Sequence, residues 1–158
     1  MGCNNILAHT AIKEDFSMKM KLRVLTNTGK GKLLALAKAM ADEYSNYAAD
    51  KIDPAYPCDG ERLVVIMVTA KAKYSDVFRR FCSSLNKGLA QNVALVVDGD
   101  MAKAQPVIDW ISAAGTNFCP EVYSINGGLP FKFIKGYTEQ EKADLFAWLE
   151  RTIQSFKA

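Results

Sequence analysis

The residues most able to do chemistry lie in one short turn, Thr26-Asn27-Thr28-Gly29-Lys30-Gly31. An apolar run comes directly before this turn, and a helical pattern of apolar residues comes directly after it. In such a strand–turn–helix unit, the backbone N–H groups of the turn and the positive end of the helix dipole point at one spot. We therefore expect this turn to bind a phosphate group. The expected ligands are the hydroxyls of Thr26 and Thr28, the amides of Asn27 to Gly31, and the charge of Lys30 or Lys32.

A purely structural explanation of the same turn stays open. A parallel sheet needs polar turns between its strands and helices, and Thr28 would then only cap the helix that follows. Two stricter phosphate-binding motifs do not fit. The nucleoside-triphosphate loop would require glycine at Thr26 and a hydroxyl residue at Leu33. The dinucleotide-binding fingerprint has two of its glycines in this turn but Leu34 in place of the third.

Apolar patterning around the turn predicts alternating strands and helices. Short, continuous apolar runs are typical of strands that are covered on both faces, and apolar residues three and four positions apart are typical of amphipathic helices. The expected strands cover residues 21–26, 50–53, 62–68, 92–97 and 118–125, and the expected helices cover residues 31–47, 76–85, 105–114 and 138–157. This alternation predicts a three-layer α/β/α sandwich with a five-stranded parallel sheet.

Capping residues predict where two of these helices begin. Ser75 precedes one helical pattern, and Thr138 and Glu141 have the spacing of a capping box at the start of the last helix. That last helix is expected to bury one apolar stripe, formed by Leu145, Phe146, Leu149, Ile153 and Phe156.

The turn and its setting resemble the flavodoxin family. The family's first loop has the form Ser/Thr-x-Thr-Gly-x-Thr, which this chain matches at Thr26, Thr28 and Gly29 and departs from at Gly31. The segment Asp98-Gly99-Asp100, after the fourth expected strand, looks like the family's Gly-Asp loop beside the flavin. The resemblance implies the strand order 2-1-3-4-5, with the ligand at the switch point between strands one and three.

The resemblance covers residues 20–157 and implies FMN as the cofactor. The implied cofactor-binding residues are Thr26, Asn27, Thr28, Gly29, Lys30, Gly31, Thr69, Ala70, Lys71, Tyr74, Asp98, Gly99 and Asp100. Tyr74 is expected either to stack on the flavin ring or to pack against the next helix. Residues 98–100 either border the flavin through backbone groups or form a simple turn. The segment 126–131 (Asn-Gly-Gly-Leu-Pro-Phe) lines the site, receives a partner, or forms a plain turn.

Two functions follow from the resemblance. One is electron transfer, or the activity of a small flavin-dependent reductase, with a redox partner protein or a small-molecule acceptor. In that case Lys71, Lys73 and Arg79 should make the flavin potential less negative than in acidic relatives. The other is a flavodoxin-fold domain without FMN that acts as a binding or regulatory module. A hydrolase or transferase finds no support, because no Ser/His/Asp or Cys/His arrangement is visible.

Composition narrows the expected partners and compartment. The chain has 158 residues, of which 49% are hydrophobic and 23% are charged, and its formal net charge is +3. Lysine and arginine alternate with acidic residues instead of clustering, so we expect no nucleic-acid partner. No window offers the ~20 apolar residues of a membrane span. The cysteines lack Cys-x-x-Cys spacing, so neither a zinc site nor a redox pair is predicted, and we expect a cytoplasmic protein with reduced thiols.

The first residues differ in character from the rest of the chain. Residues 1–19 are expected to be a disordered leader or an overextended start, and residues 20–158 are expected to form the domain. The only histidine, His9, has no metal-ligand partner nearby in the sequence and is expected to be exposed to solvent.

Overall fold

A computed structural model of the chain describes residues 21–28, 30–125 and 137–157. In chain order the elements are β1 (Leu22–Thr26), α2 (Gly31–Tyr44), β2 (Asp50–Lys51), β3 (Leu63–Thr69), α3 (Asp76–Ser84), β4 (Asn92–Asp98), α4 (Met101–Ala113), β5 (Asn117–Phe118), β6 (Tyr123–Ile125) and α5 (Glu139–Lys157). The expectations for residues 1–19, His9, Gly29 and the segment 126–131 lie outside the described residues.

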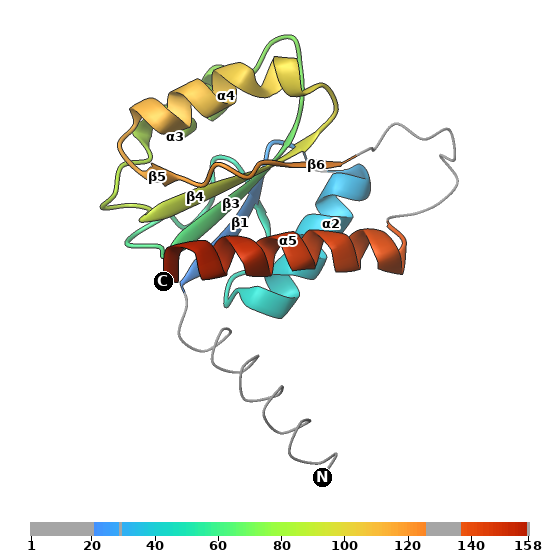
Figure 1. Cartoon of the computed structure of the whole chain (residues 1–158). Coiled ribbons are helices and arrows are strands. Elements are labelled where there is room, and N and C mark those ends of the chain that lie inside the picture. The colour runs from blue at the N-terminus through green and yellow to red at the C-terminus, as the bar shows by residue number, and fades with distance from the viewer. Residues whose placement is uncertain (1–20, 29, 126–136, 158) are drawn as a thin grey trace.

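The sheet has the order β2-β1-β3-β4-β5, with β6 also paired to β4, and all of its pairs are parallel (Figure 1). The expected doubly wound α/β architecture is therefore confirmed, and the fold is flavodoxin-like. The chain leaves β1 toward β2 on one side, whereas β3 lies on the other side of β1. This reversal places the topological switch point between β1 and β3, at the carboxyl ends of the strands.

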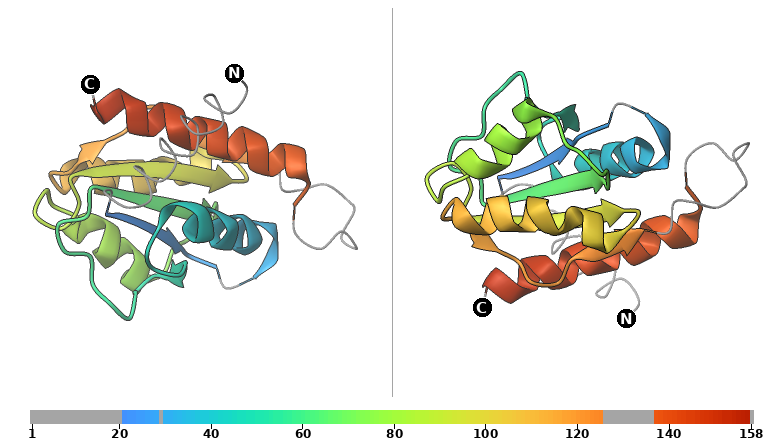
Figure 2. Two further views of the ribbon diagram at one scale, coloured as in Figure 1. Left: turned by 90° about the horizontal axis from the view of Figure 1, so that it is seen from below. Right: turned by 90° about the horizontal axis from the view of Figure 1, so that it is seen from above.

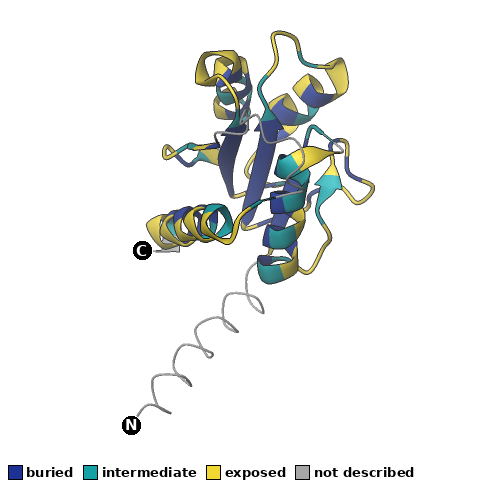
Figure 3. Cartoon of the chain, turned by 90° about the vertical axis from the view of Figure 1, so that its right-hand side faces the viewer, coloured by how far each residue is buried: buried dark blue, intermediate teal, exposed yellow. Residues whose placement is uncertain are grey.

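The central strands are buried on both faces because their sequences are continuous apolar runs. Every residue of Leu63–Val68 is fully buried. One core lies between the sheet and helices α2 and α5, and the other lies between the sheet and helices α3 and α4 (Figure 2). Figure 3 shows the buried strands between helices whose outer faces are exposed. This burial fixes the sheet as a rigid platform for the loops at its edges.

Two helix starts agree with their capping signals. The Ser75 side chain accepts a hydrogen bond from the Phe78 amide, 3.2 Å away, at the start of α3. At the start of α5, the Thr138 hydroxyl accepts from the Glu141 amide and the Glu141 carboxylate accepts from the Thr138 amide. The capping box is confirmed. The buried stripe of α5 differs from the expected one, because Trp148 is fully buried whereas Phe146 and Phe156 are only partly buried.

Two helix boundaries were predicted wrongly. Helix α2 ends at Tyr44 and not at residue 47, because Ser45 turns to extended backbone and its hydroxyl donates to the Leu22 carbonyl. Helix α4 begins at Met101, four residues earlier than expected, because the Asp100 side chain caps it. Pro106 lies inside α4, where it removes the hydrogen bond that the carbonyl four residues earlier would accept.

The last predicted strand, residues 118–125, is two short strands. Both β5 and β6 pair with β4, and a turn at Pro120 separates them. Proline has no N–H to give to the ladder, so pairing breaks there and the Val122 amide donates to the Pro120 carbonyl instead. The sheet therefore has six strands, with β5 and β6 sharing the fifth position.

Candidate functional site

The candidate site is the carboxyl edge of the sheet, where the loops after β1, β3 and β4 meet. Topology brings residues 26–28, 30–31, 69–74 and 98–100 to this one edge, as the resemblance implies. Direct hydrogen bonds then tie neighbouring loops together, and these bonds define which groups remain available to a ligand.

Asn27 joins the first loop to the end of β3. Its side-chain Nδ2 donates to the Thr69 carbonyl at 3.1 Å, and its Oδ1 accepts from the Thr69 amide at 2.8 Å. The carboxamide thus completes the pairing of β1 with β3 just beyond their last register pair. Sequence reasoning placed Asn27 in the site for its backbone amide and missed this role of its side chain, because the partner is 42 positions away.

Thr26 stabilises the turn from inside. It is fully buried, and its hydroxyl donates to the Thr28 carbonyl at 2.6 Å. Thr28 is partly exposed, and its hydroxyl makes only a long 3.5 Å contact with the Lys30 carbonyl. Of the two threonines predicted to hold a phosphate, Thr28 is therefore the one whose hydroxyl can reach a ligand.

Helix α2 begins without a side-chain cap. Its N-cap position is Lys30, no described side chain accepts from its first amides, and its first turn holds no acidic residue. The alternative in which Thr28 caps this helix is therefore wrong. Gly31 opens the helix with φ +85°, a conformation that L side chains rarely adopt, and a Cβ there would meet no atom within 4 Å. This backbone conformation favours glycine at position 31.

The two lysines at this helix start have different surroundings. The Lys32 ammonium lies 2.6 Å from Oε2 of Glu141, at the first turn of α5. The hydrogen bond from Lys32, followed by that from the Thr138 amide, holds the pKa of Glu141 below its usual range. Lys30 is exposed and pairs with no described carboxylate. Lys30 is thus the cation left free to approach a ligand, and the Lys32–Glu141 pair was not foreseen from the sequence.

The loops after β3 and β4 touch each other closely. The Ala70 amide donates to the Asp98 carbonyl at 2.9 Å. Gly99 has φ +116°, and a Cβ built on it would lie 3.3 Å from the Ala70 Cβ. The Asp100 carboxylate accepts from the Ala102 amide at 2.9 Å and so caps α4. These contacts give residues 98–100 a structural role at the edge of the site.

Tyr74 packs between α3 and α4. Its ring stacks on Phe78 with centroids 5.4 Å apart and meets the edge of Trp110 at 5.9 Å. Its hydroxyl donates to the Lys103 carbonyl at 2.7 Å and accepts from the Lys71 amide at 3.3 Å. These contacts match the alternative in which Tyr74 packs against the next helix. Its ring and its hydroxyl are already in contact with other residues of this chain.

Other ionisable groups are buried away from this edge. Glu61 is 2% exposed, with the Lys21 ammonium 3.9 Å from its Oε1. Burial raises the pKa of Glu61, although Lys21 and Arg23 act in the opposite direction. The free thiols of Cys58, Cys82 and Cys119 are buried, which raises their pKa to about 11, 12 and 11 respectively. Such thiols stay protonated at neutral pH and are poor nucleophiles.

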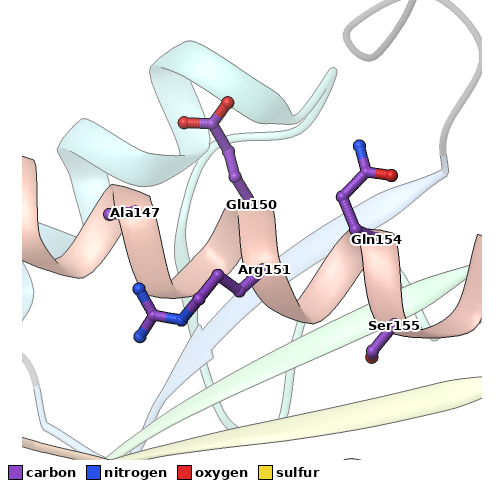
Figure 4. Close-up of a pocket in the computed structure, with 5 residues that line it drawn as sticks. All are labelled: Ala147, Glu150, Arg151, Gln154 and Ser155. Carbon is purple, nitrogen blue, oxygen red and sulfur yellow. The ribbon is translucent and has the colours of Figure 1, made fainter.

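A depression of about 680 Å³ runs along the outer side of α5 and is lined by Ala147, Glu150, Arg151, Gln154 and Ser155 (Figure 4). All five residues belong to one helix, and the Arg151 guanidinium is already paired with Glu121 at 2.8 Å. Figure 4 shows these side chains diverging from one another. This depression therefore lacks the converging polar groups of a small-molecule site.

Residues 21–28, 30–125 and 137–157 contain no group of three or more His, Cys, Asp or Glu side chains placed to hold a metal ion. Within the same ranges, no helix is both long and apolar enough to cross a membrane.

No model of a protein family matches this chain, and a search of curated proteins finds no match to it. Its function must be inferred from the residues of the site.

Proposed function

We propose that this chain binds FMN at the carboxyl edge of its sheet and serves in electron transfer or as a small flavin-dependent reductase. The observation that carries the proposal is the uncapped start of α2, beside the switch point between β1 and β3. Its first amides have no described side-chain acceptor, and an anion is the ligand that such a helix end favours.

The contrast with the other helices supports this assignment. Helices α3, α4 and α5 satisfy their first amides with Ser75, Asp100 and Thr138. Only in α2, among the described helices, does a lysine stand at the N-cap position. A positive charge there interacts unfavourably with the helix dipole. A bound anion would pair with the lysine and also interact favourably with the dipole.

In this proposal the chain's own residues bind and orient the phosphate. The α2 amides and the Thr28 hydroxyl donate to phosphate oxygens, and Lys30 adds positive charge. Asn27 and the Ala70–Asp98 hydrogen bond keep the surrounding loops in place. A bound flavin would supply the one- and two-electron chemistry, while the protein sets its orientation and electrostatic surroundings.

The local charge bears on the flavin potential. Lys71 and Lys73 are exposed on the loop after β3, whereas Arg79 lies 3.6 Å from Asp76 and is partly neutralised. Positive charge favours a reduced, anionic flavin, so the potential should be less negative than in acidic flavodoxins. A redox titration of the reconstituted protein measures this, and a very low potential would contradict it.

A second candidate is a flavodoxin-fold module without FMN that binds another ligand or regulates a partner. The observation in its favour is that Tyr74 is already occupied by contacts within the chain. Its ring contacts Phe78 and Trp110, and its hydroxyl makes two hydrogen bonds. Among the described residues of the loops after β3 and β4, no other aromatic side chain can stack on a flavin ring.

Titration of FMN by fluorescence quenching separates the two candidates. The FMN proposal expects saturable quenching, together with flavin absorbance in the purified protein. Lys30→Asp places a carboxylate at the helix start and should weaken FMN binding by at least about tenfold, since a favourable charge becomes a repulsive one.

Lys38→Glu is the matched control, because Lys38 is exposed in the middle of α2 and undergoes the same change in charge. Its FMN affinity should stay close to that of the unmodified chain. If both substitutions weaken FMN binding equally, the effect comes from overall charge. The start of α2 would then not be the phosphate-binding site. Absence of any quenching would favour the module without FMN.

A further inference from the structure

A second concavity lies at the opposite, amino-terminal edge of the sheet. It has a volume of about 530 Å³ and is lined by Lys87, Gln91, Asn92, Asn117 and Phe156. Asn92 and Asn117 are the first residues of β4 and β5, and Phe156 comes from the end of α5. A volume of this size falls within the range of small-molecule sites.

The floor of this amino-edge pocket is held in place by hydrogen bonds. Asn92 is 7% exposed; its Nδ2 donates to the Arg62 carbonyl at 3.0 Å and its Oδ1 accepts from Asn117 Nδ2 at 2.7 Å. The Gln91 amide donates to the Glu61 carbonyl at 2.8 Å. The side chain of Asn92 thus orients Asn117, and the backbone that carries Gln91 is fixed.

Several polar groups in the pocket have no hydrogen-bond partner among the described residues. Asn117 keeps its Oδ1 and one N–H, and the Gln91 carboxamide makes no hydrogen bond to any described residue. A carboxamide offers a donor and an acceptor side by side. The edges of nucleobases present the complementary pairs, which is why asparagine and glutamine bind them with two hydrogen bonds.

The remaining wall is aromatic and positively charged. The Phe156 ring lines the pocket and packs partly against the core, and the Arg62 guanidinium lies over the ring, 5.7 Å from its centroid. The Lys87 ammonium pairs with no described carboxylate. An aromatic ring suits the face of a flat heterocycle, and an unpaired ammonium suits a phosphate group.

We propose that the amino-edge pocket binds a nucleoside monophosphate. Gln91 and Asn117 bind the edge of the base, the Phe156 ring contacts its face, and Lys87 neutralises the phosphate. This site is separate from the proposed FMN site, since the two lie at opposite ends of the parallel strands. It stands on different residues and does not depend on FMN binding.

Calorimetric titration of the full chain with AMP, GMP, CMP and UMP tests the proposal. At least one of them should bind at millimolar concentration or below, whereas ribose 5-phosphate and the matching nucleoside should bind more weakly. Phe156→Leu keeps an apolar side chain but removes the ring, and Lys87→Gln removes the charge. Each should weaken binding by about tenfold, and Lys38→Gln, an exposed lysine on α2, should not.

Backbone amide shifts measured by NMR locate the bound nucleotide and separate this site from the FMN site. Perturbations centred on residues 87–92, 117 and 156 support the proposal. Perturbations confined to residues 27–33 would overturn it, as would the absence of binding by all four nucleotides. Equal weakening by Lys87→Gln and Lys38→Gln would also overturn it. A chain that binds a nucleotide here but not FMN would lose the proposed function and keep this site.

Discussion

The two edges of this parallel sheet offer a ligand different kinds of chemical group. At the carboxyl edge, the side chains of Asn27, Tyr74 and Asp100 are spent on tying loops and helices together. What stays available there is mainly the backbone at the uncapped start of α2, together with the Thr28 hydroxyl and the Lys30 ammonium. At the amino edge, the side chains of Gln91, Asn117 and Lys87 keep unspent hydrogen-bonding groups or charge.

This difference teaches what each edge can recognise. Backbone amides and a helix dipole bind anions with little regard for the rest of the ligand. Side-chain amides distinguish one heterocycle from another by its donor and acceptor pattern, and an aromatic ring binds the face of any flat heterocycle. The carboxyl edge is therefore suited to hold a phosphate, and the selection of a base is better achieved at the amino edge.

The largest expected effect on stability comes from adding a methyl group where the loops after β3 and β4 touch. Gly99→Ala forces a side chain into φ +116° and places its Cβ 3.3 Å from that of Ala70, so we expect a loss of about 3 kcal/mol in the free energy of unfolding. Chemical denaturation measures it. Gly60→Ala is the control, with φ +64° and open space around its Cβ, and should lose about 1 kcal/mol.

Adding Ala70→Gly to Gly99→Ala should restore part of the loss, because the close contact disappears while the backbone strain remains. If the single and double variants have the same stability, the two loops are not in contact as described.

The next largest effect concerns the bridge between β1 and β3. Asn27→Ala removes both hydrogen bonds to Thr69 and should cost about 2 kcal/mol of unfolding free energy. Asn46→Ala changes the same residue type at an exposed position and should stay within about 0.5 kcal/mol of the unmodified chain. Similar losses in the two variants would show that Asn27 does not hold this edge together.

A smaller, pH-dependent effect concerns the Lys32–Glu141 pair. The folded-state pKa of Glu141 is lowered, so this carboxylate stabilises the fold above its unfolded-state pKa and loses that contribution as the pH falls through the folded-state value. Glu141→Gln should cost about 1 kcal/mol at neutral pH and less in acid. Unfolding curves recorded across this acidic range measure the difference.

Glu139→Gln serves as the comparison for that substitution, because Glu139 is 88% exposed and its Oε2 makes only a long, 3.9 Å contact with the Lys142 ammonium. Its stability should change little at any pH. Glu141→Gln should also release Lys32 toward the start of α2 and strengthen FMN binding slightly. A cost that persists unchanged in acid would mean that the pair is not the source of the stability.

The smallest effect sharpens the contrast between the helix starts. Lys30→Asp should raise the unfolding free energy by about 0.5 kcal/mol, because a negative charge near the start of α2 suits the helix dipole. The same substitution is expected to weaken FMN binding, so stability and affinity should move in opposite directions. Thermal unfolding of the unmodified chain, Lys30→Asp and Lys38→Glu measures this, and a loss of stability in Lys30→Asp would contradict the uncapped start.

Local patterns predicted the sheet and most of the helices. The apolar runs that became β3 and β4, and the caps at Ser75 and Thr138, are local features and were located correctly. The start of α4 was missed because Asp100 was assigned to a flavin loop and not to a cap. The break at Pro120 was missed because the surrounding residues look strand-like on both sides.

The candidate site was predictable only in outline. Topology brings the predicted loops to one edge, but the availability of their groups depends on partners distant in sequence. Asn27 bonds to Thr69, and Lys32 pairs with Glu141, 109 positions away. Neither partner leaves a signal in the local pattern. The sequence motif therefore located the helix start but could not distinguish Lys30, which is free among the described residues, from Lys32, which is paired.

The central claim is that FMN is held by the start of α2, and NMR mapping of backbone amides during FMN titration tests it most directly. We predict that the amides of residues 30–33 shift with saturation, together with Thr28 and Thr69, and that Lys30→Asp suppresses these changes. FMN addition that leaves these amides unchanged, or that perturbs only the amino edge, would contradict the assignment.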